Sequence, residues 1–394
     1  MQYPFDDEQK ALADLTRDFM QREVAPVAIE IDNRPDPEDC FPKELLNKAS
    51  KLGLRTLAVP EDWGGGGTDH LTRTLVLWTA AQIEVGFIKC LSQAWKISHA
   101  LSNGLREDQK QFWLNRFVED DDCYGSIMMT EPDHGTENRL HNNDPKLGIR
   151  TRAVLDGDYY VINGAKVFNS LSKFARILLV FVRTDHDAPP NKGTTCFLLR
   201  GDEEGIEYTR IHDKLGWRLY PNGETSFTDV RVHKDNILGE VNGAYQIRSA
   251  LFRGSAELSA CNNGIARGLF DYCHAWAKSR VQGGKPIIEH PTVQTMLSEM
   301  LMGIEVSEQF MWRTAWGVDN DPTFNPRFTR YQKIHSDQMA TRTAQLALDI
   351  LGGIGVMKES PSEKMIRDLM AFQHGDGTDS ANHLQAATTF DQPA

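Results

Sequence analysis

Residues able to catalyse a reaction or hold a cofactor are dispersed along this 394-residue chain instead of forming a standard motif. No GxGxxG turn follows an early strand and no GxxxxGK[ST] loop occurs, so neither common phosphate-binding loop is predicted. HExxH, GxSxG and spaced His/Cys clusters are also absent, so neither a metal site nor a nucleophile elbow is predicted. The six cysteines are scattered, and we expect them to be buried free thiols in a reducing compartment.

The composition excludes several classes of protein. The chain carries 43 Lys and Arg against 55 Asp and Glu, a net charge of −12, with both signs mixed along its length. Nucleic-acid binding needs a basic face and a polybasic membrane anchor needs clustered cations, so neither is expected. No apolar run approaches the roughly eighteen residues of a membrane span, and the first ten residues do not resemble a signal peptide. We therefore predict a globular, cytoplasmic protein without membrane insertion.

Three stretches with different hydrophobic patterns must position any functional site. Residues 1–122 show apolar side chains at near-helical spacing, residues 123–240 show short β-rich runs between turn signals, and residues 241–394 are helical again. Segregated runs argue against a doubly wound sheet, in which strands and helices alternate. A helical bundle would bury the amphipathic patterns of the last stretch. These patterns cover residues 244–280, 289–317, 325–351 and 361–372.

Local signals predict where these elements begin, turn and end. Asp6 or Asp7 is the predicted N-cap of the first helix, and the glycine run 64–67 predicts a turn or a close backbone approach. Predicted strands cover 159–163, 177–182, 196–200 and 226–232. Predicted turns lie between or beside the strands, at Asp156-Gly157, Asn163-Gly164 and Pro221-Asn222-Gly223.

Several longer strings are more informative than composition. They are MTEPDHGT at 129–136, KLGWR at 214–218, FTDVRV at 227–232, NILGE at 236–240, LGGIG at 351–355, Arg367-Asp368 and DGT at 376–378. In this order and spacing, the strings resemble the acyl-CoA dehydrogenase family. The resemblance extends over nearly the whole chain, from FDDEQ at 5–9 and VPE at 59–61 onwards.

The resemblance implies a fold that agrees with the texture of the sequence. The expected architecture is mainly α, with an N-terminal helical domain (1–122), a β-barrel-like middle domain (123–240) and a C-terminal four-helix bundle (241–394). It also implies a homotetramer (or dimer) that holds FAD between subunits, with an acyl-CoA thioester clamped against the flavin. An electron-transfer flavoprotein is the expected electron acceptor, in the catabolism of fatty or other carboxylic acids.

The resemblance assigns two segments of the middle domain to the flavin. Met129 and Thr130 would hydrogen-bond the isoalloxazine edge, and Gly135 with Thr136 would lie near phosphate, Thr136 also near the substrate. A plain strand-edge turn is the alternative interpretation. Phe168 and Ser170 stand where the family usually has Trp and Thr, so ring and hydroxyl are preserved. In the family the aromatic ring covers the flavin face and the hydroxyl contacts flavin N5.

Three further residues would reach the diphosphate of FAD. Gly352 and Gly353 resemble the segment that approaches the pyrophosphate bound by a neighbouring subunit, where a Cβ would block close backbone approach. A helix C-cap after Ile350 is compatible with that role and accounts for the first glycine only. Arg280 stands where a family arginine contacts the diphosphate, although it is also readable as an ordinary surface arginine near a helix C-terminus.

The family's catalytic base is usually a Glu directly before Gly-Thr, and here that position is Asp376. In the family this carboxylate removes the α-proton of the thioester while hydride leaves the β-carbon for the flavin. The thioester carbonyl is polarised by a flavin ribityl hydroxyl and by the backbone N–H of the base. Gly375 and Gly377 flank Asp376 and are expected beside the substrate, while Thr378 is expected at the cofactor.

The change from Glu to Asp leaves two interpretations open. In the first, Asp376 is still the base, and its shorter side chain matches a cyclic or α-branched acyl group, with Gly375 providing space. In the second, normal dehydrogenation is lost and Asp376 serves another reaction. Relocation of the base to the first bundle helix is unlikely, because Phe252 to Ser255 offers no carboxylate and the nearest one is Glu257.

Other positions depart from the family pattern. Ser255 or Ala256 replaces a family arginine on the first bundle helix, and Arg253 is its possible substitute; we expect Arg253 and Ser255 to contact the substrate. Gly283, Pro291 and Asp349 stand where the family usually has Phe, Gln and Gln. These changes alter the FAD contacts, so weak cofactor retention would not be surprising.

Three function classes follow from these residues. The first is an FAD-dependent dehydrogenase that introduces an α,β double bond into an acyl-CoA. The second is a flavin oxidase or monooxygenase on the same scaffold, which would consume oxygen rapidly when reduced. The third is a non-catalytic or nucleic-acid-associated protein, which the net charge makes the weakest prediction and which a salt-dependent DNA shift would revive.

Overall fold

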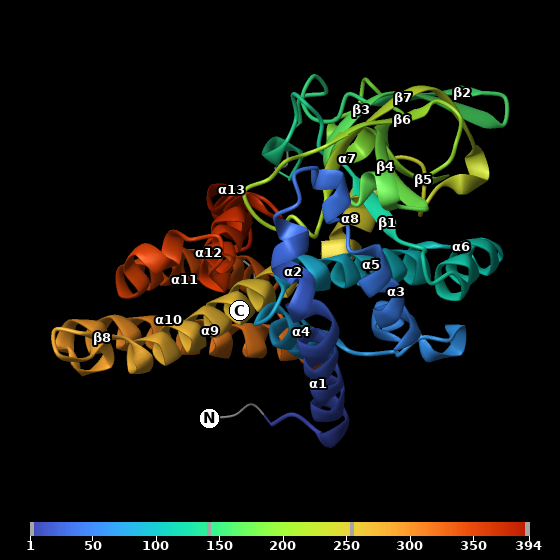
Figure 1. Ribbon diagram of the computed structural model, residues 1–394. Helices are drawn as coiled ribbons and strands as arrows, with labels where there is room; N and C mark the ends of the chain where they lie inside the picture. Colours follow the sequence, from blue (N-terminus) through green and yellow to red (C-terminus); the bar gives the residue numbers. More distant parts are fainter. Residues whose placement is uncertain (1–3, 140–142, 253–255, 391–394) are drawn as a thin grey trace.

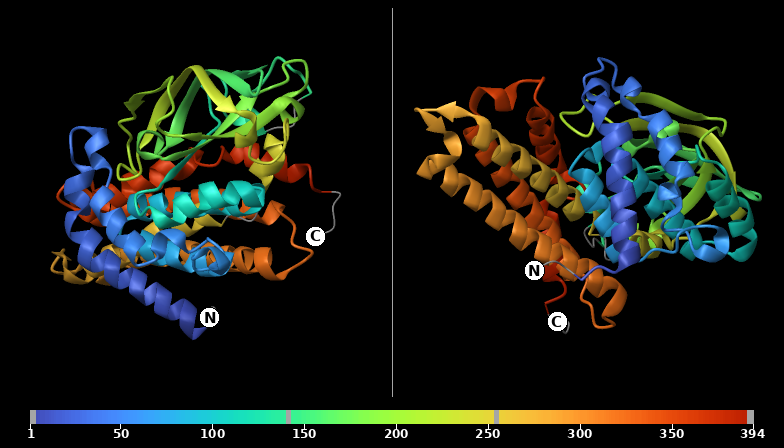
Figure 2. Two further views of the ribbon diagram at one scale, coloured as in Figure 1. Left: turned by 90° about the vertical axis from the view of Figure 1, so that its right-hand side faces the viewer. Right: turned by 60° about the horizontal axis from the view of Figure 1, so that its bottom comes forward.

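The computed structural model describes residues 4–139, 143–252 and 256–390. The chain is arranged in three parts, with N-terminal helices, a curled β-sheet above them and a long C-terminal helical bundle beside them (Figure 1). A second view shows the sheet lying across helices from both ends of the chain (Figure 2). This is the predicted order of helices, strands and helices; the exact boundaries at 122/123 and 240/241 stay predictions.

The N-terminal part consists of six α-helices. They are α1 (Asp7–Phe19), α2 (Ala25–Asp32), α3 (Lys43–Lys51), α4 (His70–Ala81), α5 (Val85–Gly104) and α6 (Glu107–Glu119). Asp6 is the N-cap of α1, as predicted, since its carboxylate accepts a hydrogen bond from the backbone N–H of Gln9 at 2.8 Å and its own backbone N–H donates to the Gln9 side-chain oxygen at 3.1 Å. A π-helical turn at Met20–Val24 links α1 to α2.

The glycine run between α3 and α4 is both a turn and a close approach. Gly64 has a φ of 81°, a backbone conformation that side chains disfavour. A Cβ on Gly65 would lie 2.3 Å from the Val59 backbone oxygen, so only glycine fits there. Both interpretations of the sequence are therefore confirmed.

The middle part is one seven-stranded sheet, with an order of β1-β4-β2-β3-β7-β6 and with β5 paired to β4. The strands are β1 (Gly125–Met128), β2 (Arg152–Asp156), β3 (Tyr159–Ser170), β4 (Ile177–Arg183), β5 (Thr194–Arg200), β6 (Ile206–Ile211) and β7 (Asn222–His233). All four predicted strands are present in longer form. The sequence patterns did not indicate β1, β2 and β6.

One of the predicted turns is correct and two are wrong. Gly157 has a φ of 63° and lies in the two-residue hairpin between β2 and β3. Asn163-Gly164 lies within β3 at a register shift, where a Cβ on Gly164 would approach the Thr151 backbone to 2.7 Å. The glycine is needed for this contact between strands and does not reverse the chain. Asn222 and Gly223 begin β7.

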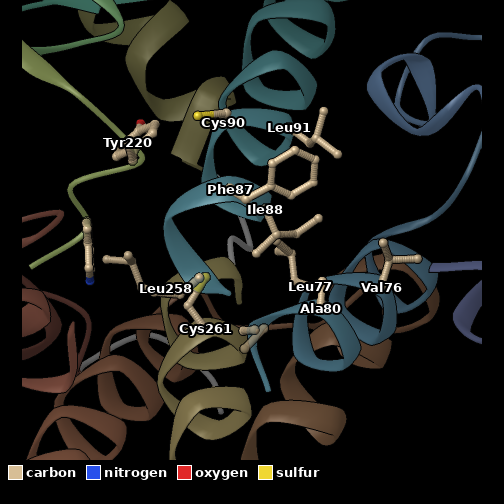
Figure 3. Packing of buried hydrophobic residues seen from close by; sticks show 14 of the residues in the cluster. Val76, Leu77, Ala80, Phe87, Ile88, Cys90, Leu91, Tyr220, Leu258 and Cys261 are labelled. Atoms are coloured by element: carbon tan, nitrogen blue, oxygen red, sulfur yellow. The ribbon is translucent and has the colours of Figure 1, made fainter. Parts of the chain in front are cut away.

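The C-terminal part contains α8 (Ala244–Phe252), α9 (Glu257–Ser279), α10 (Pro291–Asn320), α11 (Arg327–Leu351), α12 (Pro361–Ala371) and α13 (Asp379–Ala387). Helices α10, α11 and α12 match three of the four predicted amphipathic patterns, the pattern at 244–280 covers both α8 and α9, and α13 was not predicted. Apolar side chains of α4, α5 and α9 meet in the core, where Leu77, Phe87 and Leu258 are buried (Figure 3). This core holds α5 against the first turn of α9.

All six cysteines are free and buried, which confirms that part of the sequence prediction. Across the described ranges, we find no helix that is long and apolar enough to cross a membrane.

Candidate active site

Asp376 lies in the short loop between α12 and α13. Its φ is 50° and that of Gly377 is 93°, so two consecutive residues adopt the left-handed region. Asp tolerates this conformation better than most side chains do, while glycine adopts it freely. The Thr378 hydroxyl accepts a hydrogen bond from the backbone N–H of Ala381 and caps α13. The loop therefore turns sharply, which brings the Asp376 carboxylate toward α5.

A buried lysine of α11 fixes this loop from behind. The Lys333 ammonium donates to the backbone oxygens of Gln373 at 3.3 Å and Gly377 at 2.9 Å. It also contacts the carboxylates of Asp337 at 2.5 Å and Asp379 at 3.1 Å. One cation thus ties α11 to both sides of Asp376.

On the other side, Asp376 faces a buried charged network between α5 and α9. The Lys96 ammonium lies 3.5 Å from Asp376 Oδ2 and 3.1 Å from Glu257 Oε2. Glu257 Oε2 also accepts the Ser92 hydroxyl at 2.7 Å and lies 3.5 Å from the Lys89 ammonium. A purely apolar helix face would have left Glu257 without a partner.

The two lysines keep Glu257 ionised. Burial acts to raise the pKa of Glu257, but Lys96 and Lys89 outweigh it and hold that pKa below its usual range. Burial likewise acts to lower the pKa of Lys89, yet the Glu257 carboxylate raises it overall. The network therefore contains ionised pairs, held together inside the protein.

The residues predicted for the flavin lie at the edge of the sheet. Thr130 follows β1, and its backbone oxygen accepts the N–H of Val167 on β3 at 2.9 Å. The oxygen of Met129 accepts from the Lys166 ammonium at 3.3 Å, and Lys166 pairs with buried Glu131 at 2.7 Å. The end of β1 is thus fixed against β3.

Phe168 occupies an irregular position on β3. Its φ is 57°, a register shift separates Lys166 from Asn169, and the side chain is 63% exposed. The ring stacks on His212, with 4.7 Å between ring centroids. The Asn222 side-chain amide donates to the Phe168 backbone oxygen at 3.2 Å and to the Ser170 hydroxyl at 3.1 Å. The protein therefore holds an aromatic ring outward at this edge.

Tyr220 joins the sheet edge to the charged network. Its hydroxyl donates to Gln93 Oε1 of α5 at 3.1 Å and is also hydrogen-bonded to the Ser170 side chain. Burial raises the pKa of this hydroxyl, while Lys96 and Asp376 lie near enough to act on it as well. Figure 3 shows Tyr220 beside Cys90 of α5. Ser170, Tyr220, Lys96 and Asp376 therefore belong to one site.

Two of the strings singled out in the sequence contact each other here. The Asp368 carboxylate accepts the backbone N–H of Trp217 at 2.6 Å, and the Trp217 indole donates to the Asp368 backbone oxygen at 3.0 Å. A Cβ on Gly216 would lie 2.7 Å from the Arg367 backbone oxygen. The two strings are therefore in contact, where the loop before β7 packs against α12.

The comparisons with known proteins agree over the full length of the chain. Residues 6–121, 126–230 and 242–388 match the N-terminal, middle and C-terminal domains of acyl-CoA dehydrogenase. The probable acyl-CoA dehydrogenase YngJ of Bacillus subtilis is 31% identical over 98% of this chain and 99% of its own length. The chain belongs to the acyl-CoA dehydrogenase family.

Two further relatives of this acyl-CoA dehydrogenase family member place it more closely. Cyclohex-1-ene-1-carbonyl-CoA dehydrogenase of Geobacter metallireducens is 30% identical, with 96% of each chain covered. The structure of butyryl-CoA dehydrogenase from Megasphaera elsdenii superposes with a TM-score of 0.90 and 27% identity over 99% of both chains. The predicted three-domain fold is therefore confirmed, and the protein is an FAD-dependent oxidoreductase.

The described residues fit an FAD molecule. The exposed Phe168 ring offers an aromatic face at the edge of the sheet. Gly135, Gly352 and Gly353 have open space where a Cβ would stand, with no contacting atom of the described residues within 4 Å, so their backbones can be approached closely. Thr136 lies beside Gly135 in the half-buried 3-10 turn that follows β1.

The predicted residues do not all gather in one place. Arg280 ends α9 and is exposed, whereas Glu257 begins it. A 23-residue helix is about 35 Å long, so Arg280 lies far from the network around Asp376. Arg253 and Ser255 lie outside the described residues, and buried Ala256 leads into α9.

Sequence reasoning missed the lysines that surround Asp376, and it considered Glu257 only as a relocated base. One signal was available on α5, where Lys89, Ser92 and Lys96 recur at helical spacing in an otherwise apolar stretch. No comparable signal pointed to Lys333, because lysines are common on amphipathic helices.

Proposed function

We propose that this enzyme removes two hydrogens from an acyl-CoA thioester, with Asp376 as the base, to form an α,β double bond. The observation that carries the proposal is the placement of Asp376: its carboxylate lies 3.5 Å from the Lys96 ammonium and near the Tyr220 hydroxyl, and Lys333 fixes its loop. Asp376 would take the α-proton. Bound FAD supplies the acceptor for the hydride that leaves the β-carbon.

The protein's own groups would position the thioester for this step. In the proposal, the backbone N–H of Asp376 donates to the thioester carbonyl as enolate charge develops, which is the charge a preorganised donor stabilises best. Gly375 and Gly377 leave room beside the base, and Thr136, Arg253 and Ser255 would contact the substrate. Tyr220 is buried near these groups and would help to exclude water.

We assign the flavin ring to Met129, Thr130, Phe168, Ser170 and Thr378. Of these, the Thr378 hydroxyl already caps α13, so its contact with the cofactor would be additional. Gly135 would lie near phosphate.

The remaining FAD contacts support an oligomer. Arg280, Gly352 and Gly353 would reach the diphosphate of FAD held by a neighbouring subunit. The separation of Arg280 from the Asp376 network along α9 supports this, since both ends of that helix then serve different FAD molecules. We propose a homotetramer on this basis, in which neighbouring subunits complete each FAD site.

The short base favours a cyclic or α-branched acyl group. Asp376 is one methylene shorter than the Glu usual at this position, so its carboxylate is withdrawn and leaves space at the α-carbon. A relative named for a cyclic acyl-CoA, cyclohex-1-ene-1-carbonyl-CoA dehydrogenase, is 30% identical to this chain. We further propose an electron-transfer flavoprotein as electron acceptor, a role in carboxylic-acid catabolism, and a cytoplasmic location consistent with six free thiols.

Anaerobic mixing of the FAD-loaded enzyme with linear, branched and cyclic acyl-CoAs tests the function. Bleaching of the flavin band by cyclic or branched substrates is expected. Bleaching by linear ones alone would contradict the proposed acyl group while preserving dehydrogenation. Absence of bleaching with every thioester, or rapid oxygen consumption during turnover, would instead favour another reaction on this scaffold.

Lengthening the base tests its match to the substrate. Asp376→Glu should shift the kcat/KM preference toward linear acyl-CoAs by about tenfold or more, because the longer side chain fills the space left for a bulky α-carbon; a factor of ten corresponds to about 1.4 kcal/mol. The ratio of kcat/KM for butyryl-CoA to that for cyclohexanecarbonyl-CoA measures this change. An unaltered ratio would contradict the match, and Glu44→Asp on α3 is a control for carboxylate length away from the site.

A further inference from the structure

The Lys96 ammonium lies between two carboxylates that are far apart in the sequence of the C-terminal part. Its ammonium lies 3.1 Å from Glu257 at the start of α9 and 3.5 Å from Asp376 before α13, and its side chain is 5% exposed. Placing an ammonium there is unfavourable unless anions surround it. Lys96 is thus placed by the charges it neutralises.

Glu257 fixes the distance between Lys96 and Asp376. The Ser92 hydroxyl, Lys89 and Lys96 all converge on Glu257 Oε2, which holds the carboxylate against α5. Since the α9 backbone carries Glu257, the Lys96 ammonium cannot approach Asp376 more closely without lengthening that contact. The geometry leaves Asp376 beside a cation that is already partly neutralised.

We propose that Lys96 is a positioning residue for Asp376 and that Glu257 holds Lys96 in place, an inference that rests on Asp376 being the base. A thioester that enters the site removes water from Asp376, and a desolvated carboxylate tends to take up a proton. The Lys96 ammonium opposes this protonation and holds the short carboxylate in one orientation. Glu257 limits this effect of Lys96. If the Lys96 ammonium were paired with Asp376 alone, the Asp376 carboxylate would be too weak a base.

Other charged groups near Asp376 come from each element packed against it. They are Lys89 and Lys96 on α5, Glu257 and Cys261 on α9, Tyr220 before β7, and Lys333 on α11, whose ammonium binds the Gly377 backbone oxygen and pairs with Asp337 and Asp379. Burial raises the pKa of Cys261 to about 12 and also raises that of Tyr220, so both stay neutral near neutral pH. The lysines and Glu257 therefore set the local charge.

The pH dependence of kcat/KM for Lys96→Met tests the proposal. We expect the acidic limb of the kcat/KM profile to move to higher pH by about one unit or more. At pH values below the limb, kcat/KM should then be about tenfold lower than that of the wild type, and it should recover at higher pH. Lys96→Arg should restore the original limb. Glu257→Gln should move the limb in the opposite direction, because Lys96 is then committed to Asp376.

A matched control and a second variant keep the result decisive. Lys364→Met removes a buried ammonium that pairs with Glu84 and Asp368, and it should leave the limb in place. If Lys96→Met does not fold, Lys96→Gln, which keeps a polar but uncharged side chain beside Glu257, should still show the raised limb. Calorimetry with a non-reactive acyl-CoA thioether should show the same pH shift in binding.

Profiles of Lys96→Met or Lys96→Gln that superpose on that of the wild type would overturn the role of Lys96. A uniform loss at every pH would also overturn it, since that is the signature of a structural role. Failure of the proposed function looks different: Asp376→Asn would then keep full turnover. Loss of turnover in Asp376→Asn without any shift in the Lys96 variants would overturn only this inference.

Discussion

The two ends of the candidate site differ in how many of their contacts are made within the chain itself. Around Asp376, charged groups are enclosed and paired with one another by Lys96, Glu257 and Lys333. At the proposed flavin end, Phe168 is 63% exposed and Gly135 has open space beside its backbone among the described residues. A buried charge is unfavourable unless the fold places an opposite charge beside it, whereas an exposed aromatic ring is tolerated before a ligand covers it. The fold therefore preorganises the proposed base, whereas we expect the proposed flavin surface to be completed when FAD binds.

Removing the base should give the largest effect on turnover. Asp376→Asn should cut kcat by about 10²- to 10⁴-fold, the usual contribution of a general base, while FAD content stays unchanged. Single-turnover flavin bleaching measures the first effect and the visible spectrum the second. Asp321→Asn, on an exposed turn after α10, serves as control. Retained turnover would mean that another group removes the proton.

Removal of the Lys333 ammonium, which fixes the Asp376 loop, should give the second-largest effect, a loss of stability. Lys333→Met leaves Asp337 without its partner at 2.5 Å, and breaking a buried pair costs about 3–5 kcal/mol. Urea unfolding should show this loss, and kcat should fall further than in Lys364→Met, which breaks a comparable buried pair elsewhere. Equal kcat values in the two variants would show that Lys333 stabilises the fold without orienting Asp376.

At the flavin end, the expected effect falls on affinity and not on stability. Phe168→Ala should weaken FAD binding by about 2- to 10-fold, because an aromatic contact is worth about 0.5–1.5 kcal/mol beyond its area. Reconstitution of the apoprotein, followed by flavin fluorescence, measures the dissociation constant. Phe112→Ala removes another exposed ring, on α6, and should leave FAD affinity unchanged. An unchanged affinity in Phe168→Ala would remove this residue from the cofactor site.

A further effect concerns pH and belongs to α5, the helix that carries Lys89 and Lys96. Burial, together with His70 and Arg73, lowers the pKa of His99 on α5 to about 4 from an ordinary value of about 6.5. Between these values the unfolded chain binds more protons, so the His99 contribution is present above about pH 6.5 and is lost as pH falls toward 4. His99→Gln should flatten the fall in urea midpoint across that window. The same slope in wild type and variant would contradict this.

The sequence indicated the proposed flavin residues and Asp376 more directly than it indicated the charged groups around Asp376. Met129, Thr130, the glycines and Asp376 belong to local strings whose order along the chain carried the resemblance. Phe168 also needs a local backbone irregularity, which lies within its own strand. The network around Asp376 could not be read in this way, because Lys96 and Asp376 are 280 positions apart. The contact depends on how α5 packs against α9 and the loop before α13.

Local chemistry explains what the sequence determined by itself. Periodicity gave the helices, Asp6 gave the first helix cap, and Gly157 gave a hairpin, because each depends on a few neighbouring residues. The tertiary structure decided the rest. It placed Gly164 inside a strand and brought two lysines of a buried helix to Glu257 and Asp376. Charges buried at such a point are fixed by partners distant in sequence, and only packing brings those partners together.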